Sequence, residues 1–309
     1  MPETQSPRSP RPNTRLQSAL ARRFVRLLSG SETGKPPWLA QVAEGDEPGL
    51  YLPNQAPWIV HADFATLVGG VRALLMQALH PGSLAGVAQH SRYEQDPLGR
   101  LSGTIRWLTV TTFGSFEAVS GEASRVNRLH DRVKGEYPGT DGEARAYRAA
   151  DPELLLWVHA AFTDSFLTAY RELDRAEIRD VPNYVAEWAK SAEPLGLKSA
   201  PMSDAELEET INTFLKEDLG AIKETESVVH FILHPPFSKL AMPFYRLLCN
   251  AAISTMDPRV LALLDIKPKS RIWLKLVKPP LRVMQMLLGE ESPSQTIARA
   301  RIARINSVS

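Results

Sequence analysis

Two histidines and one arginine on neighbouring predicted helices are the residues best suited to chemistry in this chain. His159 lies in the middle of an apolar stripe on a helix predicted over residues 152–173, with large apolar neighbours at helical spacing: Leu155, Leu156, Phe162, Phe166, Leu167 and Tyr170. His130 lies on the apolar face of the preceding helix, predicted over residues 122–134, and Arg125 lies at the edge of that face. A neutral imidazole can ligate a metal ion or move a proton, and a guanidinium can stabilise negative charge. Core histidines with a hydrogen-bond partner show the same pattern, so both interpretations stay open.

Most other kinds of catalytic or metal site find no support in the sequence. Cys249 is the only cysteine, which excludes a disulfide framework and cysteine-based clusters, and its apolar surroundings predict a buried thiol. The chain has no Glu-x-x-His or His-Glu-x-x-His motif, glycine-rich phosphate loop or Gly-x-Ser-x-Gly elbow. His230 and His234 have metal-ligand spacing, but two prolines follow directly and no third ligand is near in sequence.

Helical periodicity through most of the chain predicts an all-α, multi-helix single domain. Amphipathic helices are expected over residues 16–28, 62–79, 83–90, 101–113, 122–134, 152–173, 181–190, 203–221, 243–254, 258–264, 270–277, 280–288 and 296–305. Residues 135–150 predict a turn-rich loop between the two site helices. Only residues 227–233 have the composition of a strand, and a buried helical turn is an equally good interpretation. Gly69 and Gly70 inside the second predicted helix indicate either close helix packing or the approach of a flat ligand.

The two ends of the chain differ in composition from its middle and divide it into four parts. Residues 1–35 form a Pro-, Ser- and Arg-rich extension that is predicted to be disordered, apart from a short basic amphipathic helix over residues 16–28. Residues 36–57 predict an irregular arm, residues 58–290 the helical domain, and residues 291–309 a basic C-terminal helix or tail. The N-terminal helix either packs on the domain or makes peripheral contact with a membrane.

Composition and charge narrow the class of protein. The 309 residues are 43% hydrophobic and 23% charged, an ordinary balance for a domain with a full core. The net charge of +1 gives no support for nucleic-acid binding. The sequence has neither a secretory signal nor an apolar run long enough to span a bilayer, so we expect a cytoplasmic protein with peripheral membrane contact at most.

An ordered series of motifs resembles the catalytic domain shared by the MpaB-type oxygenases and the latex-clearing (rubber) oxygenases. Its longest segments are ALLMQALHP at residues 73–81, DPLGRL at 96–101, VNRLHDRVKG at 126–135 and PELLLWVHA at 152–160. The resemblance covers about residues 55–290. It implies an all-helical fold with a globin-like core, one non-covalent haem b, and O2 chemistry on isoprenoid double bonds.

The resemblance also assigns roles to residues of the two site helices. The family's proximal haem ligand is the histidine of the Trp-Val-His helix, here His159, with Phe162 in the wall of the same pocket. Rubber-cleaving members carry an Arg-x-x-Lys-Thr pattern on the preceding helix, and the aligned residues here are Arg125, Arg128 and Leu129. An arginine stays protonated and cannot ligate iron as a neutral lysine can, so Arg128 is expected on the cofactor side only as a cation.

Two further histidines complete the expected site. With the lysine and threonine missing, His130 becomes the candidate for a distal donor or sixth iron ligand, and a core hydrogen bond explains its position equally well. His80 precedes Pro81 at a helix end, and this His-Pro pair lies close to the haem pocket in the family. A structural role at the helix end is the alternative for His80.

Together these assignments predict a haem-dependent oxygenase that uses O2 on a small apolar molecule, for which an isoprenoid or another alkene-containing compound is one candidate. His159 is the expected iron ligand, and Arg125 and His130 are the expected catalytic groups. An electron donor could be a further partner. The alternative function is a non-catalytic haem carrier or sensor on the same fold.

Overall fold

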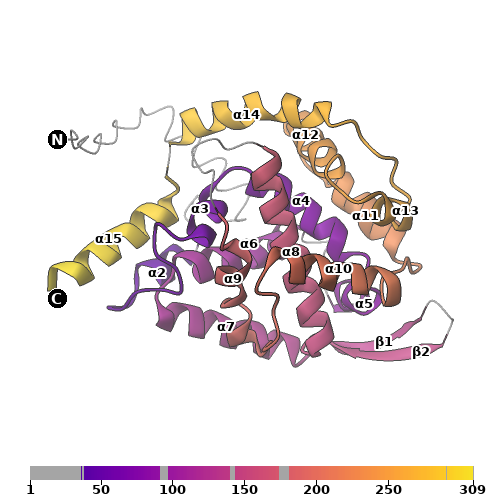
Figure 1. Ribbon diagram of the computed structural model, residues 1–309, viewed down its shortest axis with the longest axis horizontal. Helices are drawn as coiled ribbons and strands as arrows, with labels where there is room; N and C mark the ends of the chain where they lie inside the picture. Colours follow the sequence, from indigo (N-terminus) through magenta and orange to yellow (C-terminus); the bar gives the residue numbers. More distant parts are fainter. Residues whose placement is uncertain are drawn as a thin grey trace.

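Helices make up most of the computed structural model, which confirms the predicted all-α class (Figure 1). The structure describes residues 36, 38–90, 97–139, 143–173, 181–289 and 291–308. The predicted N-terminal extension lies outside these residues. In chain order the elements are α2 (Trp38–Ala43), α3 (Ala56–Ala62), α4 (Thr66–Gln77), α5 (Pro81–His90), α6 (Pro97–Phe113), α7 (Phe116–His130), β1 (Lys134–Pro138), β2 (Ala144–Arg148), α8 (Pro152–Glu172), α9 (Tyr184–Ala189), η1 (Glu193–Leu195), α10 (Asp204–Glu217), α11 (Thr225–Leu233), α12 (Met242–Ile253), α13 (Pro258–Leu263), α14 (Ile272–Leu288) and α15 (Pro293–Val308).

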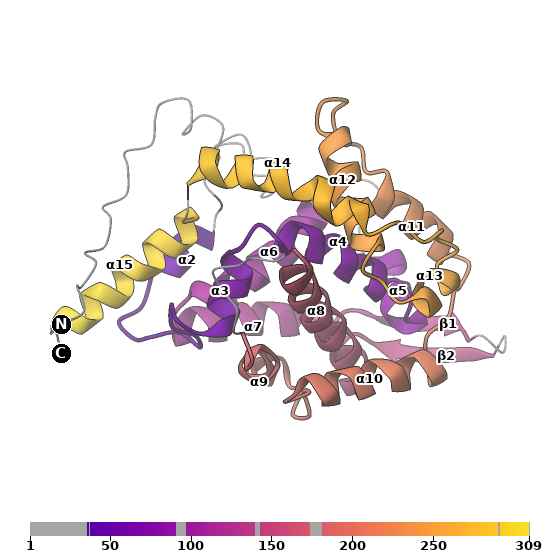
Figure 2. The same ribbon diagram turned by 45° about the horizontal axis from the view of Figure 1, so that its top comes forward.

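The long helix α8 runs through the middle of the molecule and carries His159 (Figure 2). It begins at Pro152, whose fixed φ suits a first helical position, and Glu153 in the first turn complements the helix dipole. Helix α4 packs along α8. A Cβ atom on Gly69 of α4 would lie 2.8 Å from Cδ1 of Phe166 on α8, whereas a Cβ atom on Gly70 would meet nothing within 4 Å. Close helix packing therefore explains Gly69, and no ligand is needed to account for it.

The segment between the two site helices is a β-hairpin, so the loop predicted over residues 135–150 was wrong. Strands β1 and β2 pair antiparallel, with Gly135 opposite Tyr147 and Tyr137 opposite Arg145. The hairpin packs on α5. Tyr147 is its buried residue, and its hydroxyl donates a hydrogen bond to Oε1 of Gln89 at 2.9 Å. The second ambiguous segment, residues 227–233, lies in helix α11, which confirms the helical interpretation.

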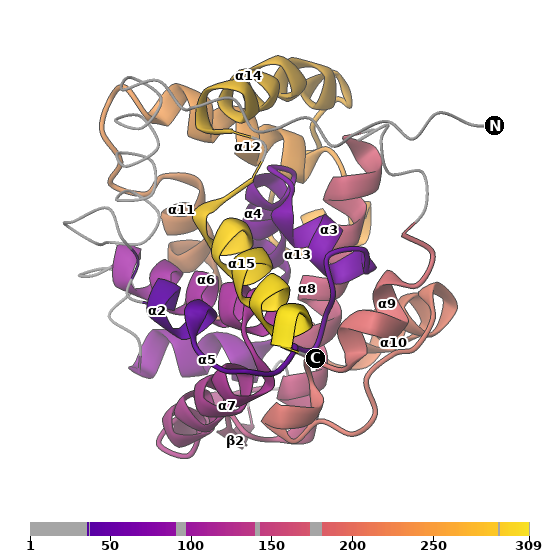
Figure 3. The same ribbon diagram turned by 90° about the vertical axis from the view of Figure 1, so that its left-hand side faces the viewer.

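The arm predicted as irregular over residues 36–57 contains a helix, α2, which packs on α15 and α6 (Figure 3). Arg301 of α15 is buried, and its guanidinium donates hydrogen bonds to the carbonyl oxygens of Val42 and Phe113. Arg304 donates to the carbonyl oxygen of Gly45 at 3.0 Å. Two basic residues of the C-terminal helix therefore hold the arm on the domain.

Among the helices that differ in extent from their predictions are α7 and α14. Helix α7 begins at Phe116 rather than at residue 122, because Ser115 caps it by accepting a hydrogen bond from the backbone N–H of Ala118 at 3.2 Å. It ends at His130. The two helices predicted over residues 270–288 form one helix, α14, that runs through Pro279 and Pro280.

No single helix among the described residues is long and apolar enough to cross a membrane, and only the bent pair α3 and α4, at 96° to each other, reaches that length and composition together.

Candidate functional site

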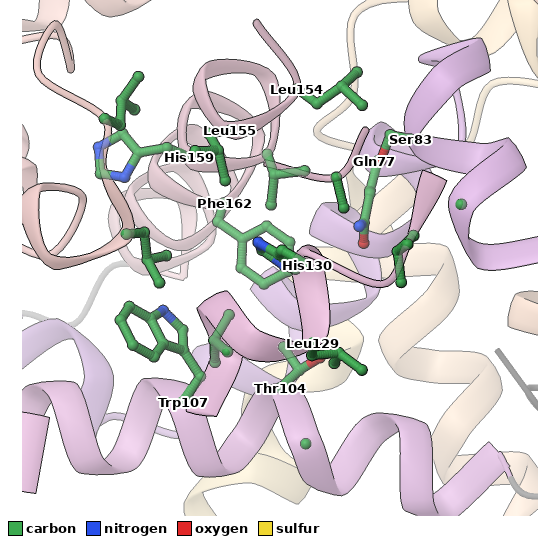
Figure 4. Close-up of a pocket in the computed structure, with 18 of the residues that line it drawn as sticks. Gln77, Ser83, Thr104, Trp107, Leu129, His130, Leu154, Leu155, His159 and Phe162 are labelled. Carbon is green, nitrogen blue, oxygen red and sulfur yellow. The ribbon is translucent and has the colours of Figure 1, made fainter. Parts of the chain in front are cut away.

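A cavity of about 370 Å³ lies between α5, α6, α7, α8 and the segment after α9 (Figure 4). This volume falls in the range of small-molecule sites. Apolar side chains form most of its wall: Val87, Trp107, Leu108, Val126, Leu129, Val133, Leu154, Leu155, Val158, Phe162, Trp188, Leu195 and Leu197. Its polar lining includes Gln77, Ser83, His90, Thr104, Arg125, His130, Tyr147, His159 and Ser191. Three of the predicted site residues, Arg125, His130 and His159, are thus brought to one cavity, together with Phe162.

His159, a residue of the cavity wall, has one ring nitrogen without a hydrogen-bond partner among the described residues. This atom, Nε2, is also inaccessible to water. Burial lowers the pKa of the imidazole from 6.5 to about 4, so the ring is neutral at pH 7. A buried polar atom without a partner is costly, and such an atom calls for an explanation such as an absent ligand. A neutral imidazole nitrogen is also the form that binds a metal ion.

Phe162 lies one turn beyond His159 on α8 and forms the adjacent part of the wall. Its ring packs edge-on against Phe166, with the ring centroids 5.8 Å apart. Phe166 in turn lies against Gly69 of α4. The α4–α8 contact therefore fixes the aromatic wall next to His159.

Arg125 belongs to a group of three charged side chains on α6 and α7. The carboxylate of Glu122 is fully buried and accepts hydrogen bonds from Nε of Arg106 at 2.8 Å, and from Nε and a terminal nitrogen of Arg125 at 3.0 and 2.6 Å. Two guanidiniums and one carboxylate leave a net charge of +1. Since Arg125 lines the cavity, this group places a positive charge in the otherwise apolar wall.

The phase of α7 decides which of its residues reach the cavity. Arg125, Val126, Leu129 and His130 all line it, as their shared helical face predicted. Arg128 is exposed and does not contribute to the wall. An α-helix turns by about 100° per residue, so Arg128 points well away from the face centred on Val126 and Leu129. Alignment alone had suggested Arg128 as a cofactor-side residue, and the structure does not bring it to the site.

His130 is partly buried at the end of α7. In the view of Figure 4 the ring of His159 lies to the upper left of the ring of His130.

His80 is a buried residue outside the cavity wall formed by the described residues. Its Nδ1 atom accepts a hydrogen bond from the backbone N–H of Gly82 at 3.2 Å, so Nε2 carries the proton and faces a carboxylate oxygen of Glu153 at 3.4 Å. Burial lowers the pKa of this imidazole. These contacts favour the structural interpretation, in which His80 orders the start of α5.

Several lining residues were not among the predicted site residues. Trp107 and Thr104 enter from α6, and Trp188 enters from α9. The ring centroids of Trp188 and His61 are 4.3 Å apart. Tyr147 comes from the unpredicted hairpin. Residues 3 apart on one helix, such as Thr104 and Trp107, share a face, and that spacing is the signal that could have identified them.

Other metal-ligating residues do not assemble into a site in the part of the chain that the structure describes. Groups of three or more His, Cys, Asp or Glu side chains able to hold a metal ion are absent there. The rings of His230 and His234 stack at 4.6 Å, and both residues are exposed. Cys249 is buried, as predicted, and burial raises the pKa of its thiol to about 12.

Comparison with known proteins places these features in a family. Neither the curated proteins nor the solved structures include a match to this chain. A family model described as the catalytic domain of ER-bound oxygenase mpaB/B' and rubber oxygenase matches residues 58–285, which is well over half of the sequence. That range contains the whole cavity wall and His159. The chain therefore belongs to the mpaB and rubber oxygenase catalytic-domain family.

Proposed function

We propose that this protein is a haem b-dependent oxygenase that oxidises a small apolar, alkene-containing molecule with O2. Family membership supports the oxygenase activity. The observation that carries the haem assignment is that His159 lines an apolar cavity and that its buried Nε2 atom has no hydrogen-bond partner among the described residues.

The residues present fit a haem held by one histidine. His159 would bind the iron through Nε2, and its low pKa keeps the imidazole neutral, which is the form that can ligate a metal ion through a ring nitrogen. When bound, haem b supplies the one-electron and O2 chemistry that protein side chains lack. Phe162, Leu155 and Val158 line the cavity beside His159 and would exclude water from the reacting atoms.

The polar residues across the cavity supply charge and hydrogen bonding. Arg125 is held by Glu122, so its guanidinium is oriented before any substrate binds. A preoriented cation in an apolar surrounding stabilises negative charge that develops on oxygen. His130 is a second group on the same helix that can hold or donate a proton at a ring nitrogen. Apolar walls with only a few polar side chains favour a hydrocarbon substrate over a polar one.

The test is spectroscopic and uses the purified full chain with added haem. We expect a Soret band in the wild type, its loss in His159→Ala, and its retention in His230→Ala, which changes an exposed histidine. A Soret band that is the same in His159→Ala would refute the assignment of the ligand. Oxygen consumption with an isoprenoid alkene then separates an oxygenase from a haem carrier, because a carrier would bind haem and consume no oxygen.

A further inference from the structure

Helix α14 has a second apolar face on its outer side. Four of its large apolar side chains are well exposed: Ile272 (48%), Leu276 (46%), Val283 (46%) and Met286 (67%). They recur at helical spacing and form one stripe, here called the outer stripe. The opposite side of the helix holds three buried residues, Leu274, Val277 and Leu281. The fold uses only this inner side for its core.

Basic side chains border the outer stripe on one flank. Lys275 and Arg282 are exposed there. Residues 266–289 contain six Lys or Arg residues and no Asp or Glu. Helix α12, which packs against α14, adds Arg246 and no acidic residue. Arg271 is paired with Glu172 of α8, so the positive charge of this surface comes from Lys275, Arg282 and Arg246.

We propose that the outer stripe and its basic flank dock this chain on an anionic phospholipid surface. A helix at a membrane interface places its apolar side among the outer parts of the acyl chains and keeps its Lys and Arg residues at headgroup level. Each such cation is attracted by the negative surface potential of anionic lipids. Helix α14 carries both parts on its outer side, and its neighbour α12 adds charge of the same sign.

Charge disfavours the two other occupants of this surface. In a symmetric pair of chains the same patch would meet itself, so the basic flanks of two copies would be brought together. The N-terminal segment at residues 15–28 carries four arginines and no acid, so it would also meet α14 with like charge. A surface of anionic headgroups is instead complementary in charge to the basic flank of α14.

The docking surface and the cavity lie on different sides of the molecule. Figures 1 and 3 show α14 at the edge opposite α7, which forms part of the cavity wall. Docking through α14 would leave the α7 side free. Substitutions in the outer stripe should therefore not change haem binding, which separates this inference from the proposed function.

Co-flotation of the full chain with vesicles tests the proposal. The vesicles contain phosphatidylcholine alone or phosphatidylcholine mixed with phosphatidylserine. We expect the wild type to float mainly with the mixed vesicles, and less at high salt. Each basic residue near the surface contributes about fivefold to partitioning, so Lys275→Ser with Arg282→Ser should weaken it about 25-fold. Leu276→Glu with Val283→Glu should abolish it.

The matched control is Met202→Glu, which changes an equally exposed apolar residue (55%) before α10 and should leave flotation unchanged. Circular dichroism of each variant verifies folding. Equal flotation with both vesicle types, or unchanged flotation of the α14 variants, would overturn the proposal. The proposal would also be overturned if the double variant Arg22→Ser, Arg23→Ser lost flotation while α14 was unchanged, because membrane binding would then belong to the N-terminal segment. A dimer that Leu276→Glu dissociates would show that a second copy covers the stripe.

Discussion

Replacement of His159 by glutamine should change how the stability of the protein depends on pH. In the folded chain burial lowers the pKa of His159 from 6.5 to about 4. Between these two values the unfolded chain takes up a proton at this position and the folded chain does not. Unfolding is therefore favoured as the pH falls from 6.5 towards 4, and the stability is fully present only above 6.5.

The size of the effect follows from the shift. One pKa unit corresponds to about 1.4 kcal/mol, so the shift at His159 removes about 3 kcal/mol of stability over this pH range. His61 and His80 add to the same trend, because burial lowers the pKa of His61 to about 3 and also lowers the pKa of His80. The wild type should therefore lose stability steeply in acid. In His159→Gln the unfolding free energy should depend less steeply on pH, because one proton fewer is taken up on unfolding.

Urea unfolding without added haem, at several pH values between 4.5 and 7, measures this slope. The comparison uses slopes, so any change in packing that glutamine causes affects only the offset between the two curves. His230→Gln changes an exposed histidine, so its unfolding free energy should show the same dependence on pH as that of the wild type. An identical slope in His159→Gln would refute the conclusion that this imidazole is buried and neutral.

Four further substitutions test the surroundings of the site. Glu122→Gln removes the charge that holds two arginines, both partly exposed, and should cost about 2 kcal/mol in urea unfolding. Gly69→Ala should destabilise the protein by about 1–3 kcal/mol, because the added methyl group meets Phe166 of α8. Gly70→Ala, in open space on the same helix, should instead stabilise it by up to about 1 kcal/mol. Arg128→Ser should leave the haem affinity unchanged, as measured by titration of the Soret band.

Each of these predictions has its own contrary result. Glu208→Gln, at an exposed position on α10, is the control for Glu122→Gln, and equal stability of the two variants would contradict a structural role for the buried carboxylate. Equal effects at Gly69 and Gly70 would contradict the close α4–α8 contact. A large loss of haem affinity in Arg128→Ser would restore that residue to the cofactor side.

Local patterns were sufficient for much of the helical structure. The periodicity of residues 152–173 predicted α8 to within one residue, and it placed His159 on an inward face that the structure brings to the cavity. The Ser203 cap of α10 is also a local signal, and Ser203 accepts a hydrogen bond from the backbone N–H of Glu206. These features depend on contacts within a few residues, so the sequence contains them directly.

The hairpin and the short helix α2 in the arm were missed because non-local contacts stabilise them. Strands β1 and β2 are five residues each and pack on α5, and neither has enough apolar residues to be recognised alone. Helix α2 has six residues, and Arg301, more than 250 positions later, donates a hydrogen bond to the carbonyl oxygen of its residue Val42.

The sequence by itself determined that most of the chain is helical and that His159 lies on an inward face of its helix, and it predicted a haem-type site around His159 and Arg125. Only the tertiary structure decided that the Nε2 atom of His159 has no partner among the described residues, and that Glu122 orients Arg125. It also placed Trp107 and Tyr147 in the wall and left Arg128 outside it. Helix phase is a local property, whereas a cavity is a space enclosed by several elements, and its lining depends on how they pack.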